Sequence, residues 1–138
     1  MSDAAETESA VLTANRAFYR AFAAGDFGLM DILWSHRAPI ACVHPGWPPV
    51  RGREKVMETW RGILSHPPTP PIRSVEPVAT VHGAFAYVIC FEVIGELYLV
   101  ATNLFVLEEG AWKLVHHQSG QTERRPGSEP ERGDRTIH

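Results

Sequence analysis

Four segments rich in β-branched and aromatic residues follow one another near the end of the chain, and they limit the possible folds more than any other feature. They cover residues 72–81, 85–94, 96–108 and 112–118, with His82-Gly83, Gly95 and Glu108-Glu109-Gly110 between them. Connections this short join antiparallel strands, because a parallel connection needs about a dozen residues or more. The pattern therefore predicts an antiparallel meander.

Helical spacing of apolar residues predicts three helices before these strands. They are residues 8–24, a shorter helix that Asp26 caps and that ends before Pro39, and residues 53–64, ended by a proline-rich run. Helices followed by an antiparallel meander indicate an α+β fold with the helices on one face of the sheet. Residues 1–120 form the predicted domain, and residues 121–138 form a polar tail.

Composition excludes several classes of protein. The chain of 138 residues is long enough for one core, and its net charge of −3 gives no basic surface for nucleic acid. Cys42 and Cys90 lie in apolar runs and are expected to be reduced thiols, although a cross-strand disulfide between them stays open. Because neither an export signal nor a membrane-spanning segment is visible, we expect a cytoplasmic protein that is not embedded in a membrane.

Residues 40–52 contain the most informative local pattern. A short apolar run predicts a buried strand that leads into His44-Pro45-Gly46-Trp47. Proline has a fixed φ and glycine can take a positive φ, so His44 is held at a stiff turn that Trp47 can cover. The imidazole is the side chain that titrates nearest neutral pH. The alternative is structural: His44 bonds to a neighbouring strand and Trp47 covers the core.

The segment 96–108 is apolar on both of its faces. One face carries Leu97, Leu99, Ala101, Asn103, Phe105 and Leu107, and the other carries Tyr98, Val100, Thr102, Leu104 and Val106. Helices on one side would leave the second face exposed to water. We therefore expect a homodimer that packs sheet to sheet, with a sheet that curls over itself as the alternative.

The order of these elements resembles the NTF2-like superfamily, and within it the SnoaL-like proteins. The resemblance rests on the run from Phe18 to Asp26, on the 40–52 segment and on the closing Trp112-Lys-Leu-Val-His-His117, and it extends over about residues 8–120. It implies an α+β cone in which a curved antiparallel sheet wraps three N-terminal helices and leaves a pocket between them. Members include isomerases, cyclases, dehydratases and non-enzymatic binders, so the fold alone does not decide the function.

Similarity to one member, the ketosteroid isomerase, implies roles for individual residues. His44 stands before a proline where that enzyme has its aspartate base, and Asn103 stands where it has a protonated aspartic acid that donates to the oxyanion. Phe18 replaces the tyrosine donor, with Tyr19 beside it. Losing one such donor costs on the order of 10²–10³ in rate, so steroid isomerisation itself is not expected.

The candidate site therefore combines His44 as a proton acceptor with Asn103 as a hydrogen-bond donor to an enolate. The alternative is that these two polar residues line a pocket and take part in no reaction. The remaining candidates for binding a small hydrophobic or aromatic molecule are Phe18, Trp34, Trp47, Trp60, Phe105, His116 and Gln118. For each aromatic ring, ordinary core packing is the competing interpretation. Strand alternation places His116 and Gln118 on the face of Trp112 and Leu114, but a register shift of one residue would reverse these faces.

Metal binding is the weakest of the chemical hypotheses. His44, His116 and a carboxylate could supply ligands, but neither His-x-x-x-His nor Cys-x-x-Cys spacing is present, and we expect no metal and no cofactor. Three functions stay open: ligand binding with proton transfer by His44, a non-catalytic ligand-binding or accessory module, and a dimerisation domain whose cavity is filled by side chains.

Overall fold

A computed structural model describes residues 3–127 and contains three helices and one six-stranded sheet. The elements are α1 (Asp3–Ala24), α2 (Phe27–Leu33), β1 (Ala41–Val43), β2 (Val50–Arg51), α3 (Arg53–Ser65), β3 (Arg73–His82), β4 (Phe85–Ile94), β5 (Leu97–Glu108) and β6 (Ala111–Gln121). The strands lie in the order β2-β1-β6-β5-β4-β3. The predicted α+β class, the three helices and the antiparallel meander from β3 to β6 are confirmed.

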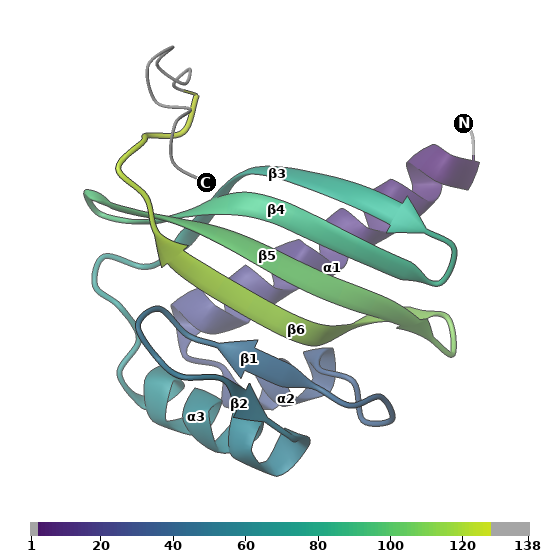
Figure 1. The fold of residues 1–138 in the computed structure, drawn as a ribbon, viewed down its shortest axis with the longest axis horizontal. Helices are drawn as coiled ribbons and strands as arrows, with labels where there is room; N and C mark the ends of the chain where they lie inside the picture. Colours follow the sequence, from purple (N-terminus) through teal and green to yellow (C-terminus); the bar gives the residue numbers. More distant parts are fainter. Residues whose placement is uncertain (1–2, 128–138) are drawn as a thin grey trace.

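The helices lie on one face of the curved sheet. Figure 1 shows α1 crossing that face, with α2 and α3 near β1 and β2 at one end. The core between helices and sheet contains large side chains from both layers, such as Phe18, Trp60 and Phe105, each at most 1% exposed. Burial of this much aromatic and aliphatic surface is the main stabilising term of the fold.

The first strand differs in direction from the predicted antiparallel sheet. β1 pairs parallel with β6, so that Ala41 lies opposite His116 and Val43 opposite Gln118. A parallel neighbour is possible because α3 and four strands separate β1 from β6 in sequence, and no hairpin fixes their relative direction. At the start of α2, Asp26 caps the helix as predicted, with its carboxylate accepting from the Leu29 amide at 3.0 Å.

The outer face of the sheet is apolar and has no helix over it among the described residues (Figure 1). Residues Val78, Ile89 and Val100 are 65%, 46% and 42% exposed, whereas Ala101 and Asn103 on the inner face of β5 are fully buried. The two-sided apolar pattern of β5 is therefore confirmed.

The ends of the described chain add two facts. β6 continues to Gln121, one residue past the predicted domain boundary, and most of the predicted tail, residues 128–138, lies outside the described residues. Of the helices in residues 3–127, none has the length and apolar character needed to cross a membrane.

Candidate functional site

The segment between β1 and β2 forms the elbow that the sequence predicts. His44 follows β1 directly and is 3% exposed. The backbone then turns through Gly46, whose φ is +81°, and the Trp47 amide donates to the His44 carbonyl at 2.9 Å. The Trp47 ring lies at 5.0 Å from the His44 ring, edge to face, and Trp47 itself is 46% exposed. The elbow therefore buries the imidazole and leaves the indole accessible.

Helix α3 fixes the tautomer of His44, that is, which ring nitrogen carries the hydrogen. The Thr59 hydroxyl donates to the Val56 carbonyl at 2.7 Å, so its oxygen can only accept from His44 Nε2, which lies at 2.9 Å. Nε2 therefore carries the hydrogen, and Nδ1 carries the free lone pair. Burial, and then nearby His117, lowers the pKa of His44 to about 4, so the ring is neutral at neutral pH.

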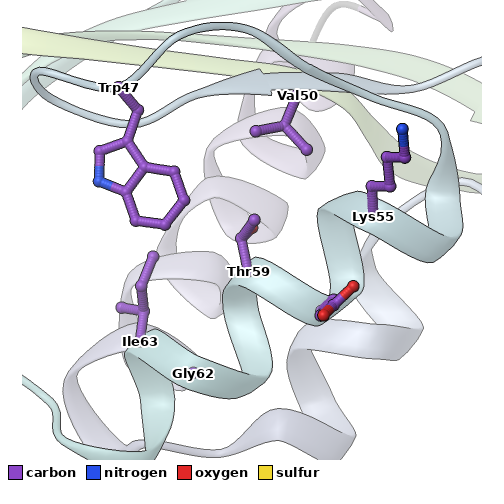
Figure 2. A pocket seen from close by; sticks show the side chains of 7 residues that line it. Trp47, Val50, Lys55, Thr59, Gly62 and Ile63 are labelled. Carbon is purple, nitrogen blue, oxygen red and sulfur yellow. The ribbon is translucent and has the colours of Figure 1, made fainter.

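A groove lies between the elbow and α3, and we call it the elbow groove. Its volume is about 640 Å³ and it is lined by Trp47, Val50, Lys55, Glu58, Thr59, Gly62 and Ile63. Figure 2 shows Trp47 on one side and Thr59 and Ile63 on the other. Thr59 links the groove to His44, because this residue lines the groove and its hydroxyl accepts from the imidazole.

A second group of polar side chains lies under α1, on the inner face of the sheet. We call it the interior network; its members are Asn15, Tyr19, Cys90, Glu92, Asn103, His117 and Ser119. The Asn103 amide donates to Asn15 Oδ1 at 2.9 Å and to Tyr19 Oη at 3.1 Å, and its oxygen lies 2.6 Å from His117 Nδ1. The Tyr19 hydroxyl lies 2.6 Å from Glu92. Every side chain named here is at most 6% exposed.

Burial dominates the electrostatics of the interior network. It raises the pKa of Glu92, and together with the Glu92 charge it raises the pKa of Tyr19 well above its ordinary value. It also lowers the pKa of His117 to about 3, with a smaller contribution from His116. Each change favours the neutral form of the group, as expected for polar groups without solvent.

With this geometry established, comparison with known proteins identifies the family. The sequence matches the SnoaL-like domain over residues 11–122, which is most of the chain. The chain belongs to the SnoaL-like domain family. A comparison with curated proteins found no match.

Solved structures agree with this assignment of the SnoaL-like domain. A candidate dehydratase of the NTF2-like family from Streptomyces avermitilis is 30% identical, with a TM-score of 0.75 over 85% of this chain and 96% of that one. A candidate calcium/calmodulin-dependent protein kinase type II association domain from Thiobacillus denitrificans is 26% identical, with a TM-score of 0.61 over 80% and 93%. A candidate ketosteroid isomerase from Parabacteroides distasonis is 14% identical, with a TM-score of 0.66 over 82% and 86%, and shares the fold.

In this SnoaL-like domain, His44 and Asn103 are both buried and belong to different hydrogen-bonded groups. The Trp60 ring is 4.8 Å from the His44 ring, and His117 contacts Asn103. Among the cavities on residues 3–127, five of 360 to 640 Å³ are lined by residues other than His44 and Asn103. Both hydrogens of the Asn103 amide are donated within the interior network, so neither is directed at a ligand.

The predicted aromatic lining divides in the same way. Phe18, Trp34, Trp60 and Phe105 are core side chains, each at most 1% exposed. Trp47 is the one predicted aromatic residue that lines the elbow groove. Edge-to-face packing of Phe18 and Trp60 at 5.5 Å fills the space in which the sequence predicts a wide cavity.

The orientation predicted for the last strand is wrong, because β6 contains a β-bulge. Leu104 pairs with His116 but Phe105 pairs with Leu114, so Val115 is an extra residue without a partner on β5. An extra residue shifts the alternation of faces by one position along the rest of the strand.

The bulge places His117, not His116, on the inner face. His117 is 1% exposed, whereas Gln118 is exposed on the outer face. His116 is half-buried, and its Nδ1 lies 3.0 Å from the Ala41 carbonyl of the neighbouring strand. His116 therefore contacts a neighbouring strand and does not lie on the inner face.

Sequence reasoning assigned no interior role to several polar members of the network, of which Tyr19 and Glu92 are the most informative. Tyr19 lies next to Asn103 although Phe18 has the position matched to the enzyme's tyrosine, so the hydroxyl is present one residue later than expected. Glu92 lies on the same face as Val88 and Cys90, which are buried. A lone carboxylate at an inward position of an apolar strand is a readable signal, because such a group is buried only with partners.

The domain offers no evident metal centre in its described part. Within residues 3–127, no three side chains among His, Cys, Asp and Glu lie close enough together to hold a metal ion. His44 and His116, the histidines considered as ligands, are directed to Thr59 and to the Ala41 carbonyl.

Proposed function

We propose that this SnoaL-like domain binds a small hydrophobic or aromatic molecule in the elbow groove. The observation that carries the proposal is the half-exposed Trp47 ring, which stands over a groove that Val50 and Ile63 line with apolar surface (Figure 2). An indole offers a large, rigid contact surface to a flat or cyclic molecule. Lys55 and Glu58 supply polar groups at the rim that can orient it.

The elbow groove supports this proposal better than the interior of the cone does. The interior is occupied by core rings and by the interior network, in which each amide and hydroxyl already has a partner. A ligand there would have to displace buried groups and leave their hydrogen bonds unmade, at a cost of about 1–3 kcal/mol for each. A ligand in the groove displaces only solvent.

Proton transfer by His44 is the finer version of the proposal. The groove side of the imidazole is a donor, because its Nε2 hydrogen is held by Thr59. A molecule that gives up a proton to His44 must therefore reach Nδ1, on the other edge of the ring. Binding in the groove and proton transfer at His44 are thus separable, and different variants test each.

Fluorescence quenching tests binding directly. Trp34 and Trp60 are fully buried and Trp112 is 9% exposed, so acrylamide should quench mainly Trp47. Naphthol, used as the probe, should protect Trp47 from the quencher, and the Trp47→Phe variant should lose the quenchable emission. Quenching that is unchanged at saturating naphthol, together with no naphthol line broadening in NMR spectra, would reject the groove as a binding site.

Deuterium exchange into cyclohexanone tests the chemistry. If His44 accepts a proton next to a carbonyl, the domain should accelerate exchange, and the rate should titrate with one group that is absent in His44→Ala. Thr59→Ser, which keeps the hydroxyl, should retain the rate. Exchange at the solvent rate in the wild-type domain, with naphthol binding intact, would leave the domain as a non-catalytic binder.

A second candidate function, dimerisation through the sheet, has its own supporting observation. Val78, Phe85, Ile89 and Val100 are large apolar side chains on the uncovered outer face, each at least 38% exposed. A second copy of the chain fits this surface, because a two-fold contact would pair like apolar strands without requiring opposite charges.

Analytical ultracentrifugation tests the dimer with matched variants. Ile89→Lys places a charge at the centre of the outer face and should yield a monomer. Ile32→Lys places the same charge at a residue of α2 that is 57% exposed and should leave the dimer intact. A wild-type chain that sediments as a monomer at every concentration would rule out this function and leave groove binding unaffected.

A further inference from the structure

Helix α3 has two faces, and a glycine stands on the face that lines the elbow groove. The core face carries the buried residues Val56, Met57, Trp60 and Leu64. The groove face carries Lys55, Glu58, Thr59, Gly62 and Ile63. Residues of the second set are three, four, seven and eight positions after the first of them, so they form one continuous stripe along the helix. Gly62 interrupts this stripe with a position that has no side chain.

The fold gives no reason for glycine at position 62. Of the ten glycines in residues 3–127, seven have a positive φ, which other residues rarely adopt, and Gly62 is not one of them. A Cβ built on Gly62 would meet no described atom within 4 Å beyond its chain neighbours and its own helix, so close packing does not exclude a side chain. The position also lies inside α3, three residues before the helix ends at Ser65, and is not a cap.

Glycine at this position weakens the helix. In a helix interior, glycine lowers the folding equilibrium constant about fivefold relative to alanine, which corresponds to about 1 kcal/mol. Natural proteins accept such losses of stability mainly at functional sites. Because the fold gains nothing from Gly62 and Gly62 lines the elbow groove, the reason for the glycine lies in the groove: the backbone of α3 stays open to whatever occupies it.

We propose that Gly62 determines which ligands the elbow groove accepts, by allowing a flat, uncharged aromatic ring to lie between the backbone of α3 and the Trp47 indole. The proposal rests on ligand binding in this groove, as proposed above. Figure 2 shows Trp47 opposite the part of α3 that carries Thr59, Gly62 and Ile63. Trp47 is 46% exposed, so its indole offers a flat apolar wall on which an aromatic ring can stack.

The charges in the lining favour an uncharged ring. Lys55 and Glu58 are both exposed, carry opposite charges and are three residues apart on α3, which makes them neighbours on the helix surface. A ligand with a net charge of either sign would be attracted by one of them and repelled by the other. A neutral aromatic ring with a hydroxyl group meets neither penalty and can form a hydrogen bond with either side chain.

Substitutions at Gly62 should change stability and binding in opposite directions. Gly62→Ala should raise the folding equilibrium constant in urea unfolding about fivefold. The same variant should weaken naphthol binding about fivefold or more, because the new methyl group takes space that the ring needs, and Gly62→Leu should weaken it further. The matched control is Gly28→Ala, at an exposed glycine of α2 outside the groove, where the new Cβ would meet Asp26 Oδ1 at an ordinary 3.6 Å. It should leave naphthol affinity unchanged.

The saturated analogue of naphthol tests the shape of the ligand. Decahydronaphthol keeps the two fused rings and the hydroxyl group but is not planar, so it should bind wild type about two- to tenfold more weakly, because aromatic stacking is lost. Equal affinity for the two compounds would overturn the preference for a flat ring.

The remaining outcomes separate the role of Gly62 from the groove itself. Naphthol affinity that is the same in wild type, Gly62→Ala and Gly62→Leu would overturn the role of Gly62 and leave the groove as a binding site. A Gly62→Ala chain less stable than wild type would also overturn it, because the fold itself would then require the glycine. A wild-type chain that binds no naphthol would overturn this inference together with the proposed function.

Discussion

The interior network and the elbow groove contain similar residue types but use them in opposite ways. In the interior network, Asn103 makes three hydrogen bonds to buried partners on α1 and β6. At the elbow, the half-exposed Trp47 ring lines the groove and remains open to a ligand. Polar groups that are fully paired specify the fold, whereas a partly open surface is available for binding.

The difference shows that a polar residue in the expected place is not yet a functional one. Asn103 has the position predicted for an oxyanion donor, but its hydrogens are committed to Asn15 and Tyr19. His44 makes a hydrogen bond through Nε2, and its Nδ1 lone pair has a weak partner in the Cys42 sulfur at 3.8 Å, so part of its chemistry is uncommitted. Substitutions in the two regions should therefore differ in which property they change.

The largest effect is expected from Asn103→Ala. The substitution leaves Asn15, Tyr19 and His117 without their partner in a buried environment, and each unmade hydrogen bond costs about 1–3 kcal/mol. The free energy of unfolding, measured in urea, should fall by about 3 kcal/mol or more. Gln118→Ala, on the outer face beside His117, should change it by less than about 0.5 kcal/mol. Similar values for the two variants would mean that the interior network does not stabilise the fold.

Lowering the pH should have the next largest effect on the free energy of unfolding, and it acts on both regions. The pKa values of His44 and His117 are lowered to about 4 and about 3, so each contributes stability above its unfolded pKa of about 6.5 that is lost as pH falls. Each histidine should cost about 1.4 kcal/mol per pH unit between about pH 6.5 and its lowered pKa.

Urea unfolding at a series of pH values in this range gives the slope of the free energy of unfolding against pH. His44→Gln should lower the wild-type slope by about 1.4 kcal/mol per pH unit, because it removes one of the two histidines that burial keeps neutral. Equal slopes in wild type and His44→Gln would show that His44 is not held neutral in the folded state.

The sequence predicts the elements of this domain well because each has a local cause. Asp26 caps α2, the Gly46 turn ends the elbow strand, and the Glu108-Glu109-Gly110 turn joins β5 to β6, all of which depend on residues within a few positions. The family resemblance, built on the same local patterns, is also confirmed.

The candidate site is less predictable because it depends on register and on packing. A single extra residue, Val115, exchanges His116 for His117 on the inner face, and no composition signal marks it. Whether Phe18 and Trp60 line a cavity or fill it depends on distances between separate elements. The lone inward carboxylate of Glu92 was readable, but its partners on α1 and β6 were not.

A smaller effect on stability is expected from Thr59, which links the elbow groove to His44. Thr59→Val keeps the shape of the side chain but leaves the Nε2 hydrogen of His44 without an acceptor, at a cost of about 1–2 kcal/mol. Nitrogen NMR should then show hydrogen on Nδ1 of His44 in a larger fraction of molecules. Thr59→Ser should retain both the stability and the wild-type tautomer. An unchanged tautomer in Thr59→Val would mean that another contact, such as Cys42 at 3.8 Å from Nδ1, orients the ring.

The smallest effect on stability, and the largest on binding, is expected from Trp47→Ala. The side chain is 46% exposed and makes no hydrogen bond that the fold requires, so the free energy of unfolding should change by about 1 kcal/mol or less. Naphthol binding, followed by ligand-observed NMR, should weaken at least about tenfold, because the indole supplies one wall of the groove. Asn103→Ala should show the reverse, with a large loss of stability and unchanged naphthol affinity in the folded fraction. If Trp47→Ala instead left the affinity intact and Asn103→Ala abolished it, the ligand would bind inside the cone, and the assignment of the open and the fully paired regions would have to be exchanged.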